Sequence, residues 1–153
     1  MNYQDEKWMR LALGQAKIAM EMGEVPVGAV IVRGEELLSA AHNRCHTDGL
    51  ATAHAEILAI EEACRKTGSW RLQDCTLYVT LEPCPMCAGA SVNARIPRVV
   101  FAAKDPRMGA CGSLIDLSAY PLEIRPTYVS RVLESESLDL LQAFFSEMRK
   151  NKK

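Results

Sequence analysis

The sequence predicts an α/β fold, in which a mixed or mostly parallel sheet carries helices on both faces. Short buried apolar runs alternate along the chain with longer segments of helical periodicity. Of the 153 residues, 48% are hydrophobic, which is enough to build one sizeable core. The turn at 33–35, Arg-Gly-Glu, separates two of the runs as a hairpin. We therefore expect a single domain over residues 1–153.

The expected elements follow in order. An amphipathic first helix ends near Gly23. Its apolar stripe is Trp8, Leu11, Ala12, Ala16 and Ala19. Strands are expected over 26–32, 37–41, 75–81, 98–102 and 127–133. Helices are expected over 54–67, closed by Gly68, over 85–94, and over 137–149 with Ser137 as N-cap. The segments 43–52 and 104–113 are predicted to be loops.

Two short motifs together supply three ligands suited to zinc. His54 stands two residues before Glu56, and Cys84 and Cys87 form a Cys-x-x-Cys pair after a predicted strand. The pair opens a helix that Pro85 helps to start, so both sulfurs face one side near the positive helix end, which favours thiolates. Three protein ligands leave one position for water, as in catalytic rather than structural zinc sites.

The chemistry that such a site performs depends on a carboxylate that is not a ligand. Zinc lowers the pKa of bound water from about 16 to about 7. Glu56 lies close enough in sequence to approach that water without binding the metal. It can accept a proton and pass it to a departing amine, which is the requirement for hydrolytic deamination of a nucleobase.

Two other interpretations of the cysteine pair are open. A strand followed by Cys84-x-x-Cys87 also fits a thioredoxin-like redox motif, and only the upstream His54 and Glu56 favour zinc over redox chemistry. A structural zinc site needs a fourth ligand. The remaining candidates are His42, Cys45, His46, Cys64, Cys75 and Cys111. None makes a second short-spaced pair suited to one metal, so we expect the cysteines outside the motif to be free packing residues.

Net charge and composition limit the binding partners and the cellular compartment that the sequence predicts. The formal net charge is −1, so any polyanion has to be held by a local basic patch. No apolar run is long enough to span a membrane, and the first residues have no signal-peptide pattern. We therefore expect a cytoplasmic chain with no membrane association.

Longer motifs give the chain a resemblance to the bacterial tRNA-specific adenosine deaminases of the cytidine deaminase-like superfamily. They are Glu-Val-Pro-Val-Gly-Ala-Val at 24–30, His-Asn-Arg at 42–44, Ala-His-Ala-Glu at 53–56, the run 77–90 ending in Pro-Cys-Pro-Met-Cys-Ala-Gly-Ala, and Phe-Phe at 144–145. The zinc signature is shared across the superfamily. The flanking segments 98–106 and 112–114 are what resemble the tRNA enzymes.

The resemblance implies a cytidine deaminase-like three-layer α/β/α fold with a central mixed five-stranded sheet. It implies hydrolysis of adenosine to inosine at the first anticodon position of tRNA, through attack of zinc hydroxide on C6 of adenine. By position, His54, Cys84 and Cys87 would bind one Zn²⁺ and Glu56 would shuttle protons. No organic cofactor is expected.

Substrate contacts also follow from the resemblance. Asn43 would hydrogen-bond the base, although by itself it reads as a turn residue, and the amide of Ala55 would help to hold water or the base. Further expected RNA contacts are Arg44, Asp105, Arg107, Phe144, Phe145 and Arg149. Phe145 shares an apolar stripe with Leu138, Leu141 and Met148, so a role in the core is predicted as strongly as a role in stacking on RNA. Phe144 is therefore the preferred stacking residue.

The sequence departs from the family pattern at two places. It reads Glu123-Ile124 where the family often has Asn-His, which puts one RNA contact in doubt, and Arg131 stands where glycine is usual. The resemblance also implies a homodimer that binds the tRNA anticodon stem-loop. The alternatives are a free-base or nucleotide deaminase with the same zinc chemistry, and a zinc module that binds RNA without catalysis.

Overall fold

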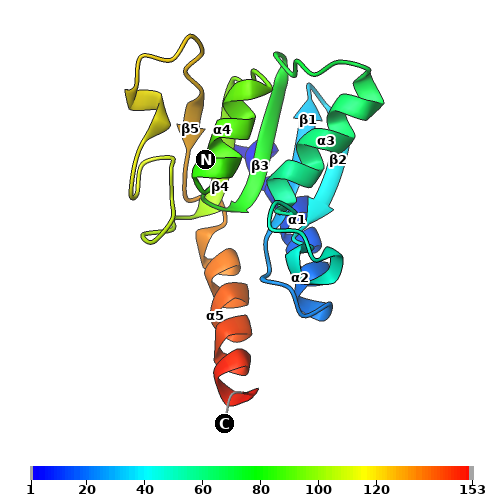
Figure 1. The fold of residues 1–153 in the computed structure, drawn as a ribbon, viewed down its shortest axis with the longest axis vertical. Coiled ribbons are helices and arrows are strands. Elements are labelled where there is room, and N and C mark those ends of the chain that lie inside the picture. The colour runs from blue at the N-terminus through cyan, green and yellow to red at the C-terminus, as the bar shows by residue number, and fades with distance from the viewer. Residues whose placement is uncertain (1, 152–153) are drawn as a thin grey trace.

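The structure, a computed structural model, describes residues 2–151 as a five-stranded sheet between two layers of helices (Figure 1). The elements are α1 (Tyr3–Glu21), β1 (Gly28–Arg33), β2 (Glu36–His42), α2 (Cys45–Asp48), α3 (Ala55–Thr67), β3 (Cys75–Leu81), α4 (Pro85–Asn93), β4 (Arg98–Ala103), the 3₁₀ turn η1 (Leu117–Ala119), β5 (Thr127–Val129) and α5 (Glu134–Asn151).

The sheet is mixed, as predicted. Its strand order is β2-β1-β3-β4-β5. Strand β1 is antiparallel to both β2 and β3, while β3, β4 and β5 run parallel. Figure 1 shows α3 and α4 on one face of the sheet and α1 on the other, with α5 extending beyond it. The predicted three-layer α/β/α architecture is therefore confirmed.

Successive side chains of each strand point to opposite faces of the sheet and so build two hydrophobic cores, one on each face. Ile31 and Leu77 point into the core beneath α3 and α4, whereas their neighbours Val30 and Tyr78 point into the core beneath α1. Side chains of a strand alternate between faces, so a strand covered on both sides is apolar at nearly every position. This is why β1, β3 and β4 read as continuous hydrophobic runs.

Helix α1 packs closely on the sheet. A Cβ atom at Gly28 would overlap the carbonyl oxygen of Ala12, so only glycine allows the strand to approach the helix this closely. The predicted stripe is correct except at Leu11, which is 44% exposed. Met9 and Leu13 are buried instead, because each lies next to a buried residue of the stripe and the two are four residues apart, on the same face of the helix.

The last strand is shorter than predicted, and the cause lies just after it. Strand β5 ends at Val129, whereas the prediction extended to residue 133. Arg131 and Leu133 adopt φ values of 68° and 56°, and this left-handed conformation is incompatible with a continuing strand. A glycine at position 131 would adopt the same conformation without strain.

The last helix begins earlier than predicted. It starts at Glu134, so Ser137 lies inside the first turn and is not the N-cap. The Ser137 hydroxyl is buried and donates a hydrogen bond to the carbonyl oxygen of Thr80 at 2.6 Å. This contact fixes α5 beside the end of β3, where the candidate site begins.

The predicted loop 43–52 contains the short helix α2. The buried Glu24 carboxylate accepts hydrogen bonds from the backbone N–H groups of His46 and Thr47 and from the Thr47 hydroxyl. Burial opposes ionisation, but the bonds from Thr47 and His46 outweigh it and lower the pKa of Glu24.

No helix within residues 2–151 is long and apolar enough to cross a membrane.

Candidate active site

The two predicted zinc-ligand motifs lie at the N-termini of neighbouring helices. His54 is the N-cap of α3 and Cys84 is the N-cap of α4, and neither side chain is used to cap its helix. Cys87 lies in the first turn of α4, and Glu56 lies in the first turn of α3. Two positive helix ends therefore face one small volume, which favours anionic ligands there.

The three predicted ligands come together in the fold. The distance from His54 Nδ1 is 3.7 Å to Cys84 Sγ and 3.4 Å to Cys87 Sγ, and all three atoms lie within 4.8 Å of one another. Two ligands of a tetrahedral zinc with ordinary Zn–N and Zn–S bonds would be about 3.6 Å apart. The residues present thus fit a metal of this size and softness.

The metal-ligating group contains three residues and no fourth. Among residues 2–151, His54, Cys84 and Cys87 are the only His, Cys, Asp or Glu side chains that gather in this way. The other cysteines do not join the group, and all six cysteines are free thiols. A structural zinc site would need a fourth protein ligand, and residues 2–151 supply none beside these three. The arrangement therefore favours a catalytic site, in which water takes the fourth coordination position.

Hydrogen bonding prepares the sulfurs for a metal. The bond with the Cys87 thiol, opposed by burial and assisted by His54, lowers the pKa of Cys84 to about 4. The bond to Cys84 and burial raise the pKa of Cys87. The bond with Cys84 also raises the pKa of His54. One thiolate therefore forms readily, while the second needs the positive charge that a metal brings.

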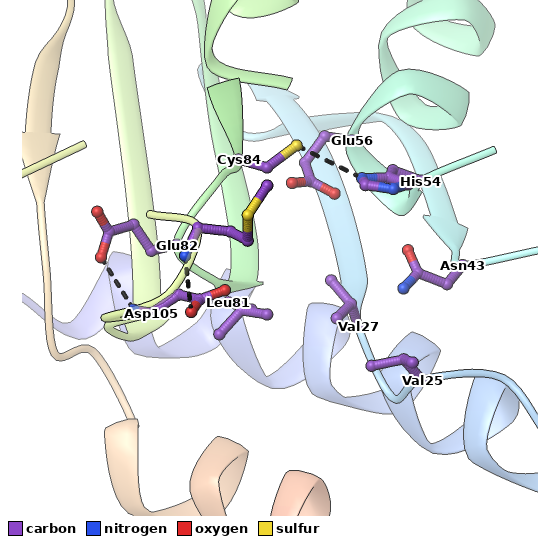
Figure 2. Close-up of a pocket in the computed structure, with 10 residues that line it drawn as sticks. Val25, Val27, Asn43, His54, Glu56, Leu81, Glu82, Cys84 and Asp105 are labelled. Carbon is purple, nitrogen blue, oxygen red and sulfur yellow. Dashed lines mark hydrogen bonds between the residues drawn. The ribbon is translucent and has the colours of Figure 1, made fainter. Parts of the chain in front are cut away.

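Glu56 lies beside this group without belonging to it (Figure 2). Its side chain is only 4% exposed, and burial raises its pKa to about 7. A carboxyl group with a pKa near neutrality can both accept and donate a proton, as general acid–base catalysis requires.

A cavity of about 260 Å³ is lined by Glu56 and by two of the predicted ligands, His54 and Cys84. Its lining consists of Val25, Val27, Asn43, His54, Glu56, Leu81, Glu82, Cys84, Asp105 and Met108. The volume lies below the usual range for drug-sized ligands, roughly 300–1,000 Å³. A small cavity lined by both apolar and polar side chains suits a single flat heterocycle.

Asn43 is held in one orientation by the helix that carries the ligand. Its side-chain oxygen accepts a hydrogen bond from the backbone N–H of Ala55 at 2.8 Å. The N–H can only donate, so it fixes the amide oxygen toward α3 and leaves the NH₂ group for the cavity. The Ala55 N–H, which we expected to hold water or the base, is donated to Asn43 instead.

The remaining predicted contacts are spread around the cavity mouth. Asp105 lines the cavity, and its carboxylate accepts backbone hydrogen bonds from Arg107 and Met108. Arg107 borders an adjacent hollow. Arg44 is turned away from the cavity and pairs with Asp48 at 2.9 Å. Arg149 is exposed in the last turn of α5, and the end of the basic tail, residues 152–153, lies outside the described residues.

The exposure of the two phenylalanines is the reverse of the prediction. Phe144 is 7% exposed and Phe145 is 43% exposed, and their rings meet edge to face with centroids 5.3 Å apart. The side of α5 that faces the protein carries Ser137, Leu141 and Phe144, which are spaced by four and three residues and so share one face of the helix. Phe145 is therefore the ring that is free to stack on a base.

Sequence reasoning missed several residues that line the cavity. They are Val25, Val27, Leu81, Glu82 and Met108. The apolar members looked like ordinary strand residues. Glu82 gave no signal of burial, because acidic residues are mostly exposed and its hydrogen-bond partners lie far along the sequence.

Comparison with known proteins places this geometry in a family. The MafB19-like deaminase family matches residues 3–149. The tRNA-specific adenosine deaminase of Bacillus subtilis (strain 168) is 51% identical over 151 residues, which cover 98% of this chain and 94% of the relative. The enzyme of the same name from Aquifex aeolicus (strain VF5) is 46% identical and covers 95% and 97% of the two chains.

A solved structure agrees with these relatives. It comes from studies of A-to-I editing by tRNA:A34 deaminases at the wobble position, with a TM-score of 0.86 and 43% identity over 88% of this chain and 99% of that one. Both the sequence and the fold lead to the same group. This chain belongs to the MafB19-like deaminase family and, within it, to the tRNA-specific adenosine deaminases.

Proposed function

We propose that this chain is a zinc-dependent hydrolase that converts adenosine to inosine at the first anticodon position of tRNA. The observation that carries the proposal is the cluster of His54, Cys84 and Cys87 beside the non-ligating Glu56, in one cavity with Asn43. Near-full-length identity to tRNA-specific adenosine deaminases supports the choice of adenosine over other bases. We assign residues 1–153 to a single deaminase domain.

The metal assigned to the cluster is one Zn²⁺ per chain. Two thiolates and one imidazole are ligands typical of zinc, and the three donors leave the fourth corner of a tetrahedron without a protein group. When bound, zinc would act as a Lewis acid that makes water acidic enough to react near neutral pH.

The protein groups then divide the work. Glu56 accepts the proton of the attacking water and delivers it to the departing amine, so that ammonia leaves. Burial raises the pKa of Glu56 toward the range where both transfers are possible. The NH₂ group of Asn43 donates to a ring nitrogen of the base, which keeps C6 close to the metal.

The nucleic acid has to present its base singly. A stacked or paired base cannot enter a cavity of this size, so the anticodon loop would be splayed open when it binds. Exposed Phe145 is suited to stack on a flanking base, and we assign phosphate contacts to Arg107, which borders the hollow beside the cavity, and to exposed Arg149. Arg44 would contact RNA only by exchanging its ion pair with Asp48 for one with a phosphate.

The assembly and its location are also proposals. We propose a homodimer in the cytoplasm, where tRNA is modified, and the sedimentation of the purified chain tests the dimer. A species of one chain's mass at micromolar concentration would contradict it.

One experiment separates this function from its alternatives. The purified protein is incubated with anticodon stem-loops that carry adenosine at the first anticodon position and, separately, with free guanine, cytosine and adenosine. We expect inosine in the stem-loop and little ammonia from the free compounds. Ammonia from a free base alone would identify a small-molecule deaminase. Binding of the stem-loop without inosine formation by zinc-loaded protein would identify a non-catalytic RNA module.

A further inference from the structure

Glu82 lies between β3 and the ligand Cys84, and it is buried with 2% exposure. Its carboxylate accepts hydrogen bonds from the backbone N–H groups of Asp105, Cys111 and Ser113, each at 3.0 Å. The Ser113 hydroxyl donates to it as well. All four donors come from one segment, residues 105–113, which we call the wall loop.

The match between this side chain and its partners is specific. Each carboxylate oxygen accepts two hydrogen bonds, and every partner is a donor. A glutamine would place an NH₂ group against two of those donors, so the bonds on that side would be lost. An aspartate is one methylene too short to reach them from the same backbone position.

A glycine in the wall loop confirms how closely the two parts fit. A Cβ atom at Gly109 would overlap the carboxylate of Glu82 and the carbonyl oxygen of Asp105. The loop is also tied to the ligand segment by the backbone bond from Ala110 N–H to the carbonyl oxygen of Pro83, 2.9 Å long.

The wall loop forms one side of the cavity. Asp105 and Met108 line it together with Leu81 and Glu82, whereas His54 and Glu56 line it from α3 (Figure 2). We propose that Glu82 is a positioning residue for substrate binding, which fixes the wall loop relative to the metal ligands so that the cavity holds its shape before the base arrives. This inference rests on the proposed function.

The proposal predicts a particular division between kinetic constants. Loosening the wall loop costs binding energy, because the loop has to be ordered at each encounter, but it leaves Glu56 and the ligands in place. For Glu82→Gln we expect the KM for an anticodon stem-loop to rise at least tenfold, with kcat within about threefold of wild type and one zinc per chain. Amide hydrogen exchange within 105–113 should accelerate in the substrate-free variant.

Two further variants sharpen the test. Asp5→Asn is the control, because it removes an equally buried, hydrogen-bonded carboxylate on the opposite side of the sheet. A change that only destabilises the fold reduces the amount of active protein without changing KM. Ser113→Ala removes a single donor and should raise KM two- to fivefold in the same direction. Because Ser113 acts through Glu82, adding Ser113→Ala to Glu82→Gln should have little further effect.

These experiments distinguish failure of the Glu82 proposal from failure of the proposed function. Inactivity of the wild-type, zinc-loaded protein on every stem-loop would count against the function itself. With an active wild type, an unchanged KM and unchanged exchange in Glu82→Gln would overturn the positioning role. If Glu82→Gln does not fold, Ser113→Ala decides, and an unchanged KM in that variant overturns the proposal equally.

Discussion

Asn43 and Ala55 are joined by a hydrogen bond of 2.8 Å that runs from the backbone of a ligand-bearing helix to the side chain of a cavity residue. The bond links the orientation of the Asn43 amide to the start of α3, where His54 and Glu56 lie. The proposed base-reading residue and a proposed metal ligand are therefore held by the same end of one helix.

This bond leads to a prediction for Asn43→Asp. The aspartate still accepts from Ala55, so the fold should be retained, but the NH₂ donor is lost. We expect kcat/KM to fall about 100-fold, equivalent to losing one hydrogen bond and leaving a polar atom of the base unpaired. Steady-state kinetics with an anticodon stem-loop measure it, with zinc content checked in parallel. Retained activity would show that the Asn43 donor does not read the base.

The metal centre gives a second prediction. His54→Ala and Cys84→Ala should each lose zinc and activity, whereas Cys64→Ser, which alters a cysteine outside the cluster, should keep both. Removing zinc from wild type with a chelator should also lower the Tm. A metal at 1,000 times its Kd adds about 4 kcal/mol to the stability of the folded state. Elemental analysis and thermal melts test this, and an unchanged Tm after complete zinc removal would contradict it.

The third prediction concerns pH and the ion pair between buried Asp5 and half-buried Arg98. Arg98 donates two hydrogen bonds to Asp5, at 2.8 and 2.7 Å, and the Tyr78 hydroxyl donates a third. The Arg98 bond is the main cause of the lowered pKa of Asp5, against the opposing effect of burial. A lowered carboxyl pKa stabilises the fold above the unfolded value, near 3.8, and this stability is lost as the pH falls through the folded value.

Asp5→Asn should therefore cost about 2 kcal/mol of unfolding free energy at pH 7, and the difference from wild type should shrink below about pH 4. Denaturant unfolding at several pH values measures it. Glu36→Gln, which removes an exposed pair with Arg33, is the control and should change stability by less than about 0.5 kcal/mol. A pH-independent difference for Asp5→Asn would show that the charge of Asp5 is not the stabilising feature.

The fourth prediction concerns the left-handed residue after β5. Arg131 adopts φ 68°, a conformation that costs a non-glycine residue about 1 kcal/mol, and the ion pair that it makes with Glu134 is long at 3.8 Å. Arg131→Gly should raise the unfolding free energy by roughly 1 kcal/mol, after the weaker ion pair is lost. Arg125→Gly, at an ordinary φ, should give no gain. A loss of stability in Arg131→Gly would contradict the assignment of strain.

The two phenylalanines of α5 give the fifth prediction. Phe144→Ala empties a buried position and should destabilise the fold by about 3 kcal/mol. Phe145→Ala should leave stability nearly unchanged and weaken stem-loop binding by roughly 1–3 kcal/mol, because a stacked base loses its platform. Thermal melts and binding titrations with the two variants provide matched controls for each other. Equal RNA affinity in Phe145→Ala and wild type would remove Phe145 from the binding surface.

Sequence reasoning reached the parts of the site that depend on local spacing. His54, Cys84 and Cys87 were identifiable because ligand pairs at helix starts recur at short separations, and the buried strands were identifiable because their runs are apolar at nearly every position. The predicted sheet of five strands and the free thiols follow from the same local patterns.

The features that sequence reasoning missed depend on contacts between distant segments. Glu82 and Ser113 meet only because a long loop folds back over the end of β3. The start of α5 was misplaced because Ser137, a good capping residue, instead bonds to Thr80 across the core. The exposure of Phe144 and Phe145 was reversed because the predicted stripe ran through Leu138 and Phe145, whereas α5 buries Ser137 and Phe144 on either side of Leu141. For Ser137, a tertiary hydrogen bond outweighed the local preference for a cap.

Inosine formation in an anticodon stem-loop by Glu56→Gln protein that carries one zinc per chain decides whether Glu56 is the proton shuttle. Removing the proton shuttle while keeping the metal should lower turnover at least about 1,000-fold, within the range that general acid–base catalysis contributes. Glu61→Gln, an exposed position on the same helix, should retain wild-type turnover. Turnover of Glu56→Gln within tenfold of wild type would contradict the central claim that Glu56 moves the protons of this reaction.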